Sequence, residues 1–549
     1  MNPFRRTALV LPLLLLGCKA GPSAFDRRSG VDQHLEDTAD VANLPHLPEA
    51  AEVEAYDMSP NGSEPPGASD AGSGAHEAMT AGSGAVAASG PGSQPPDPPP
   101  PSVVVDGEAP RFERPERVRG IYLNAWASGS RRRMDDLLDL ARRTEINTFV
   151  IDIKDAMGYV SHRTEVLMAR EIGATGEVRI RDVRGLLARL HAEGIYPVAR
   201  IVVVKDPLLS AAHPEMAVQD TAGGAFVDAK GIVWLNPYDR GVWAYHVALA
   251  AEVAALGFPE IQWDYVRFPD ITADDKARTV YPGAGGVPKA QAIADFLAYS
   301  REALSDLDVT VTADVFGVTT SASRDVGIGQ VWESVIGSVD IALPMVYPSH
   351  YWKGSFGFDS PNAHPYEVVK RAIEDALRRS AEVEGAGATR PWLQDFTLGP
   401  PRYEAPEVRA QIQAAYDAGV QEWILWNPGS RYTTDALEPE AGFEREPAMR
   451  IAGRIVPVSE RWTVIDSIRL AKIAAETADT LSGAATADTV PVAVPADTVP
   501  MAVPADTVTK RPPPVDSVRG PGKPPDTVRV DTLRPGGPAA RDPAGPTRR

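Results

Sequence analysis

The chain has 549 residues, including 51 prolines and 46 glycines, and a formal net charge of -19. This length allows two to four domains. Proline and glycine gather toward the two ends, whereas nearly all aromatic residues lie in the middle, so we expect one large domain between two poorly structured arms. The negative charge disfavours nucleic acid as a partner. A single cysteine, Cys18, excludes an internal disulfide and a zinc site built from thiolates.

Residues 1–18 have the pattern of an export signal. Two arginines precede a short apolar run over 8–16, which is too short for an ordinary membrane-spanning helix. The next letters, LLGC at 15–18, resemble the lipobox of bacterial lipoproteins, where cleavage leaves a lipidated cysteine first. We therefore expect lipidation at Cys18, an exported protein held at the cell envelope by this lipid anchor in the membrane, and, because Lys19 follows, an outer-membrane destination. The alternative is a plain secretory signal with an incidental cysteine.

Two low-complexity segments flank the middle of the chain. Residues 19–114 are rich in Gly, Ser, Ala and Pro and predict a disordered linker, because they cannot bury enough apolar surface to offset their ordering entropy. Residues 456–549 predict a Pro-rich tail with repeats, ADTVPVAVP at 487–495 and ADTVPMAVP at 496–504. A nine-residue repeat is too short for a helical solenoid, so we interpret the tail as a passive spacer, with cell-wall contact as the alternative.

Residues 115–455 alternate strand patterns with amphipathic helix patterns, which is typical of a parallel sheet with crossover helices. Strands are predicted at 118–126, 147–154, 195–204, 260–267, 309–316, 339–347, 391–396 and 422–427. Helices are predicted at 133–143, 182–193, 241–256, 289–305, 329–336, 365–382 and 406–418. With one more helix to close the ring, these units predict an α/β fold, the (β/α)8 TIM barrel. The alternative, a doubly wound open sheet, usually needs a glycine-rich phosphate loop after the first strand, and none occurs there.

Catalytic residues of such barrels lie at the carboxyl ends of the strands. Alternation along the fifth predicted strand places Thr310, Thr312 and Asp314 on the face opposite to the valines, so Asp314 should point into the barrel mouth. The same argument points Gln262 and Asp264 inward from the fourth strand. We therefore expect two catalytic carboxylates, Asp264 and Asp314, at similar height on neighbouring strands.

Other polar and aromatic residues at the strand ends are candidates for substrate binding, because flat rings stack on sugars and carboxylates serve acid–base chemistry. They are Trp126, Asp152, Lys154, Asp155, Arg267, Tyr347, His350, Tyr351 and Trp426. Structural roles are the alternative: lysine and aspartate can pair, rings can fill the core, and a loop histidine can be incidental. Since no HxH or HExxH spacing occurs, we expect no metal site, with calcium held by isolated carboxylates as the alternative, and we expect no cofactor.

Five segments carry a resemblance to a known family: IYPVARIVVVKD at 195–206, WLNPY at 234–238, QWDYVRFPD at 262–270, TADVFG at 312–317 and PMVYPSHY at 344–351. They resemble, over about 118–440, a glycoside hydrolase family whose TIM-barrel domain was formerly of unknown function. The DYVRFP block is also similar to alpha-amylase and alpha-galactosidase-like barrels. The resemblance implies that Asp264 is the nucleophile or base and that the acid comes from strand five or six. Asp314 is the carboxylate there, a departure from the glutamate of the alpha-amylase pattern.

The sequence thus predicts O-glycosyl hydrolysis of an envelope or extracellular polysaccharide or oligosaccharide. Asp264 would attack the anomeric carbon or activate water, and Asp314 would protonate the leaving oxygen. One alternative is a non-catalytic glycan-binding surface lipoprotein that uses the same barrel mouth. Another is amide or ester cleavage, against which the lack of a metal-ligand cluster and of a GxSxG elbow argues.

Overall fold

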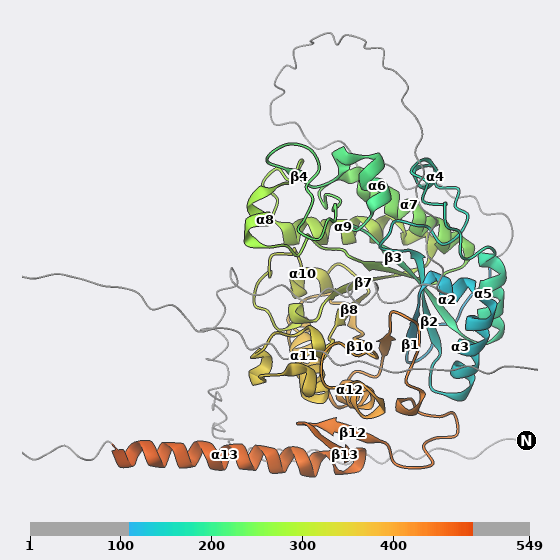
Figure 1. The fold of residues 1–549 in the computed structure, drawn as a ribbon. Helices are drawn as coiled ribbons and strands as arrows, with labels where there is room; N and C mark the ends of the chain where they lie inside the picture. The colour runs from blue at the N-terminus through green and yellow to red at the C-terminus, as the bar shows by residue number, and fades with distance from the viewer. Residues whose placement is uncertain (1–108, 487–549) are drawn as a thin grey trace, which may run out of the picture. The chain divides into compact units, whose positions relative to one another are not determined.

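The computed structural model describes residues 109–486, with side chains to residue 479. The predicted signal with Cys18, most of the linker and the repeats of the tail lie outside the described residues. Eight parallel strands form a closed ring, because the order β10-β11-β1-β2-β3-β5-β7-β8 is completed by a pairing of β10 with β8 (Figure 1). The barrel strands are β1 (Arg119–Leu123), β2 (Thr148–Lys154), β3 (Tyr196–Val202), β5 (Glu260–Asp264), β7 (Thr310–Phe316), β8 (Ile341–Met345), β10 (Trp392–Gln394) and β11 (Trp423–Trp426).

Every barrel strand but the last is followed by a crossover helix, so the predicted (β/α)8 TIM barrel is confirmed. The crossover helices are α3 (Arg131–Arg143), α5 (Val183–Ala192), α7 (Arg240–Leu256), α9 (Lys289–Ala303), α10 (Trp332–Ile336), α11 (Pro365–Ser380) and α12 (Ala405–Asp417). Their apolar residues recur every three or four positions; in α3 these are Met134, Leu137, Leu138 and Ala141, all buried against the strands.

Shorter elements lie in the loops between the strands and after β11. They are α2 (Ala125–Gly129), α4 (Leu167–Glu171), α6 (Pro207–Ala212), β4 (Gln219–Asp220), α8 (Ala273–Arg278), β6 (Thr279–Val280), β9 (Ala388–Thr389), β12 (Ala448–Ile451), β13 (Arg454–Pro457) and α13 (Arg461–Thr486). The strand β4 pairs antiparallel with β6, so the long loops that follow β3 and β5 are joined to each other.

The segments at the two ends of the barrel differ from expectation. No eighth crossover helix follows β11 among the described residues; instead, the hairpin of β12 and β13 packs on α12 and α11. Residues 461–486, expected within the proline-rich tail, form α13, because this stretch lacks proline and is rich in helix-forming residues. The last residues of the predicted linker contact the barrel, with Phe112 against its core and Arg114 paired with Glu422 at 2.8 Å. No helix in the described part is both long and apolar enough to cross a membrane.

The side chains inside the barrel form two walls, one mostly apolar and one mostly polar. Strands β1, β8, β10 and β11 supply most of the apolar wall, with Tyr122, Leu343, Trp392, Ile424 and Trp426; Val150 of β2 and Tyr196 and Val198 of β3 belong to the same apolar cluster. Strands β2, β3, β5 and β7 supply the buried polar side chains Asp152, Arg200, Gln262, Asp264 and Asp314. The candidate site lies where these two walls meet at the carboxyl ends of the strands.

Candidate active site

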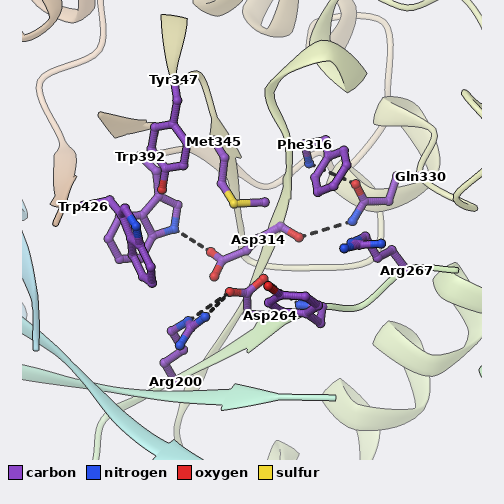
Figure 2. A pocket seen from close by; sticks show the side chains of 11 residues that line it. Arg200, Asp264, Arg267, Asp314, Phe316, Gln330, Met345, Tyr347, Trp392 and Trp426 are labelled. Carbon is purple, nitrogen blue, oxygen red and sulfur yellow. Dashed lines mark hydrogen bonds and ion pairs between the residues drawn. The ribbon is translucent and has the colours of Figure 1, made fainter. Parts of the chain in front are cut away.

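A pocket at the carboxyl ends of the strands contains both predicted catalytic carboxylates, Asp264 and Asp314 (Figure 2). They stand level with each other, because the register pairs Trp263 of β5 with Ala313 of β7. Both side chains point inward, as the alternation predicted, and they are 6% and 1% exposed. The pocket is lined by Arg200, Asp264, Tyr265, Arg267, Asp314, Phe316, Gln330, Met345, Tyr347, Trp392 and Trp426.

The carboxylate of Asp264 is held on both of its oxygens. Arg200 donates from Nε at 2.9 Å and from Nη2 to Oδ2, and the backbone N–H of Tyr265 donates to Oδ1 at 2.6 Å. Tyr265 has a φ of 51°, a left-handed conformation that a tyrosine adopts only when its surroundings enforce it. This arrangement fixes Asp264 in an ion pair, and an ionised carboxylate is the state that a nucleophile or base needs.

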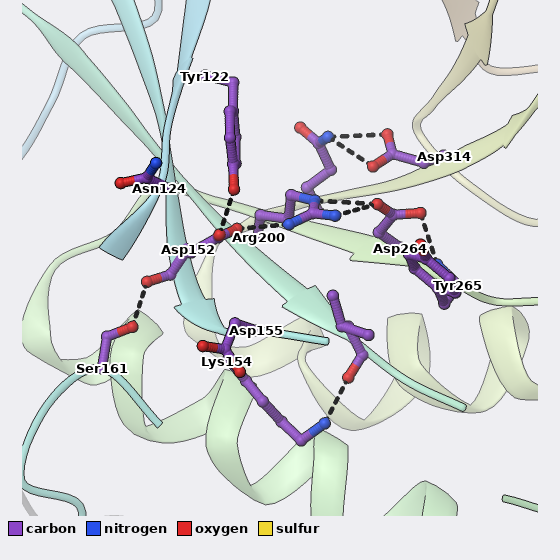
Figure 3. A network of polar contacts seen from close by, with 12 residues as sticks. Tyr122, Asn124, Asp152, Lys154, Asp155, Ser161, Arg200, Asp264, Tyr265 and Asp314 are labelled. Carbon is purple, nitrogen blue, oxygen red and sulfur yellow. Dashed lines mark hydrogen bonds and ion pairs between the residues drawn. The ribbon is translucent and has the colours of Figure 1, made fainter. Parts of the chain in front are cut away.

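Arg200 joins Asp264 to a second carboxylate deeper in the barrel (Figure 3). Its Nη1 donates to Asp152 at 2.5 Å, and Asp152 also accepts from the hydroxyl of Tyr122. Burial alone would lower the pKa of Arg200, but the two carboxylates raise it well above its usual value. The guanidinium is therefore a permanent cation beneath the pocket, and Asp152 positions it from below.

Asp314 differs from Asp264 in its electrostatic surroundings. Burial, followed by the negative charge of Asp264, raises the pKa of Asp314 well above its usual value, with Arg200 opposing the effect. Its Oδ1 accepts from Trp392 Nε1 at 2.7 Å and from Gln262 Nε2 at 2.8 Å, whereas Oδ2 accepts from Gln262 alone, at 3.0 Å. A carboxyl that keeps its proton near neutral pH is what general acid catalysis requires, and Oδ2 is the oxygen freer to carry it.

Aromatic side chains form one side of the pocket. The ring of Trp426 stacks on Tyr122 at 3.9 Å between centroids and meets Trp392 edge to face at 5.6 Å. The Nε1 of Trp426 is buried and has no hydrogen-bond partner within the described part of the chain. This side therefore offers apolar surface for a sugar ring and one N–H for a hydroxyl group.

On the opposite side, Arg267 lies over three aromatic rings. Its guanidinium is 4.9 Å from the ring centre of Trp234, 5.0 Å from Tyr265 and 4.7 Å from Phe316. Gln330 lies beside it and accepts from the backbone N–H of Phe316 at 2.9 Å. The rings hold a second cation at the pocket wall.

Five of the predicted site residues line this pocket: Asp264, Asp314, Arg267, Tyr347 and Trp426.

The charged residues predicted at the end of β2 lie outside the pocket. Lys154 is fully buried and binds Asp206 at 2.9 Å and the Val202 carbonyl at 2.8 Å. Asp155 accepts from the backbone N–H groups of Met157 and Tyr159 and pairs with Arg179. Asp152 lies below Arg200, outside the pocket lining. That these three bind substrate stays a prediction: each has a charged partner within the protein, and none lines the pocket.

The remaining predicted residues also lie outside this pocket. His350 and Tyr351 lie in the loop that follows β8, where His350 contacts the ring of Tyr347 and Tyr351 contacts that of Phe356. Burial lowers the pKa of His350 to about 4 and raises that of Tyr351, so both are neutral packing groups. Trp126 is 51% exposed and lines a separate groove. Among residues 109–486, no group of three or more His, Cys, Asp and Glu side chains could hold a metal ion.

The sequence reasoning missed the cation that organises the pocket. Arg200 stands in the middle of the apolar run 195–204, and an arginine there needs a buried carboxylate partner. That signal was available. No comparable signal marks Trp392, which opens its strand, or Phe316, Gln330 and Met345, which reach the pocket from different loops and strands.

The family model with the description "Putative glycosyl hydrolase domain" matches residues 120–432. Among solved structures, a hypothetical protein from Ruminiclostridium thermocellum is 40% identical, with 36% of this chain and 97% of that chain covered and a TM-score of 0.32. The glycoside hydrolase domain of PgaB from Bordetella bronchiseptica is 13% identical, with 57% and 95% covered and a TM-score of 0.39. The spore cortex-lytic enzyme SleL from Bacillus megaterium is 10% identical, with 58% and 72% covered and a TM-score of 0.34.

The comparison with curated proteins gives no match. The matched family region begins at the second residue of β1 and ends beyond β11, so it contains the barrel except for Arg119, and every residue that lines the pocket. The match covers more than half of the 549 residues. The chain therefore belongs to the family described as "Putative glycosyl hydrolase domain".

Proposed function

We propose that the protein hydrolyses O-glycosidic bonds, with Asp264 and Asp314 as its catalytic carboxylates. The observation that carries the proposal is the difference between these two level, neighbouring side chains. Asp264 forms an ion pair with Arg200, whereas the pKa of Asp314 is raised by burial and by the charge of Asp264. A carboxylate held in an ion pair beside a carboxyl group of raised pKa matches the base or nucleophile and the acid of a glycosidase.

In the first step the Asp314 proton passes to the glycosidic oxygen, the bond from this oxygen to the anomeric carbon breaks, and the leaving sugar departs with a hydroxyl group. The anomeric carbon forms its new bond either to Oδ1 of Asp264 or to a water whose proton Asp264 takes. In the first route a water later displaces Asp264 and returns a proton to Asp314. The first route retains the anomeric configuration and the second inverts it, so proton NMR of the first product distinguishes them.

The substrate that we propose is an envelope or extracellular polysaccharide or oligosaccharide. The support comes from residues 15–18, which resemble a lipobox; export and lipidation at Cys18 would bring the chain to such glycans. Incorporation of labelled palmitate into the wild-type protein but not into Cys18→Ser, with the protein recovered from membranes, tests this location. Equal labelling of the two proteins would contradict the anchor.

The direct test of the reaction is release of reducing ends by the full chain across bacterial and plant polysaccharides, including the envelope glycans of the source cell. The matched control is the double variant Asp264→Asn/Asp314→Asn, which keeps the shape of both side chains. We expect release by the wild type only. Binding of a glycan without product, by both proteins and across the whole panel, would replace this proposal with a non-catalytic glycan-binding lipoprotein.

A further inference from the structure

A second, larger groove lies outside the catalytic pocket. Trp126 and Arg179 line it, together with the first residues of α3 and α5. We propose that this groove binds a distal segment of an anionic polysaccharide, a chain whose sugars carry carboxylate groups. The proposal rests on the proposed glycosidase function and names its class of substrate.

The groove opens on the same end of the barrel as the catalytic pocket. Crossover helices run back against the strands, so the first turns of α3 and α5 lie at the end where the strands finish. Trp126 belongs to α2, which begins two residues after the end of β1. A polysaccharide chain that enters the pocket can therefore continue across this face to the groove.

A preorganised aromatic platform stands in the groove. The Trp126 ring is 51% exposed, and the guanidinium of Arg179 lies 4.4 Å from its centre. Arg179 is held in turn by ion pairs with Asp155 and Glu177. The backbones approach closely here, since a Cβ on Gly129 would lie 2.1 Å from the Arg179 carbonyl oxygen. An exposed ring with a fixed orientation is what stacking on a sugar needs.

The charges of the groove favour an anion. Four arginines and three carboxylates line the groove: Asp135 pairs with Arg189 and Glu177 pairs with Arg179, whereas Asp182 accepts from a neutral donor, the Gly185 N–H, at 2.8 Å.

Two arginines of the groove, Arg131 and Arg181, have exposed side chains that form no hydrogen bond or ion pair with any residue from 109 to 486. A chain of net charge -19 repels polyanions in general, whereas the residues that line the groove carry a formal charge of +1, from four arginines and three carboxylates, so an acidic glycan gains attraction here.

Affinity electrophoresis of the full chain tests the groove, with polygalacturonate as the probe and its fully methyl-esterified form as the uncharged control. The variants are Trp126→Ala and Arg131→Ala/Arg181→Ala. The matched control is Arg132→Ala, an exposed arginine on the same helix that does not line the groove. We expect the wild type to bind the acidic polymer more tightly than its methyl-esterified form. Either groove variant should bind the acidic polymer about tenfold more weakly, the loss expected when one contact of about 1.4 kcal/mol is removed. Arg132→Ala should bind it as the wild type does.

The outcomes separate this proposal from the proposed function. Equal binding to both polymers, wild-type affinity of Trp126→Ala, or tighter binding of a single-stranded oligonucleotide than of polygalacturonate would overturn the groove assignment and leave hydrolysis untouched. Where a hydrolysed polymer is identified, Trp126→Ala should raise KM on long chains with kcat unchanged, and should leave KM on a disaccharide-sized substrate unchanged. Undiminished binding of polygalacturonate by Asp264→Asn shows that the groove acts apart from the chemistry.

Discussion

The carboxyl ends of β2 and of the β5–β7 pair carry similar charged residues, yet the structure uses them in opposite ways. At the end of β2, Lys154 and Asp155 form ion pairs with other residues of the protein, and neither lines the pocket. At the ends of β5 and β7, Asp264 and Asp314 line a pocket. Strand-end position brings charged groups to the rim in both places. What distinguishes a candidate catalytic residue is whether the fold leaves part of its hydrogen-bonding capacity facing the pocket.

The largest effect should be on kcat, and it should follow from removal of the proposed acid. Asp314→Asn should lower kcat about 10³-fold, because a general acid contributes roughly 10²–10⁴-fold. Its raised pKa means that the active, protonated form is lost as pH rises through that pKa, so the wild-type rate falls on the alkaline side. Initial rates from pH 5 to pH 10 should show that Asp314→Asn lacks this fall. A variant with wild-type rate and profile would remove Asp314 from the mechanism.

On the β2 side the effect should appear in stability. Lys154→Met leaves the buried Asp206 carboxylate without its cation, and breaking a buried pair in this way costs about 3 kcal/mol or more. Urea unfolding should show the loss, while kcat of the folded fraction stays near wild type. Unchanged stability together with a raised KM would restore Lys154 as a substrate ligand.

The smallest of these effects concerns His350, another predicted site residue that lies outside the pocket. Its pKa is lowered to about 4 by burial, so the unfolded chain takes up a proton before the folded one does as pH falls below about 6.5. The contribution of His350 to stability is therefore complete above pH 6.5 and lost as pH falls toward 4, on the order of 2 kcal/mol. His350→Gln should flatten the decline in unfolding free energy between pH 7 and pH 4.5. Parallel declines for the two proteins would contradict the burial argument.

Much of the fold could be predicted because local periodicity decides it. The eight strands were recognisable from buried runs such as 147–154, and each was placed within a few residues of its observed bounds. The elements after the barrel, β12, β13 and α13, were not predicted. A TIM barrel is complete with eight strands, so its pattern does not call for further elements after β11. The helical composition of 461–486 was hidden beside the proline-rich repeats.

The site could be predicted in part. Alternation along β5 and β7 is a local property, and it placed Gln262, Asp264 and Asp314 inside the barrel. The pairing of Lys154 with Asp206 depends on the distance between the end of β2 and the loop after β3, and the sequence alone does not give this distance. For the same reason, a ring that lines the pocket, such as Trp392, looks like any core tryptophan in the sequence.

The most direct test of the central claim is kcat for two variants that carry the same substitution at the same rim. Asp264→Asn removes a carboxylate that lines the pocket; Asp395→Asn removes one that is equally buried but accepts from Thr433 instead. We predict that Asp264→Asn abolishes measurable hydrolysis while it stays folded, and that Asp395→Asn keeps kcat near wild type. Full hydrolysis by Asp264→Asn would remove Asp264 from the mechanism.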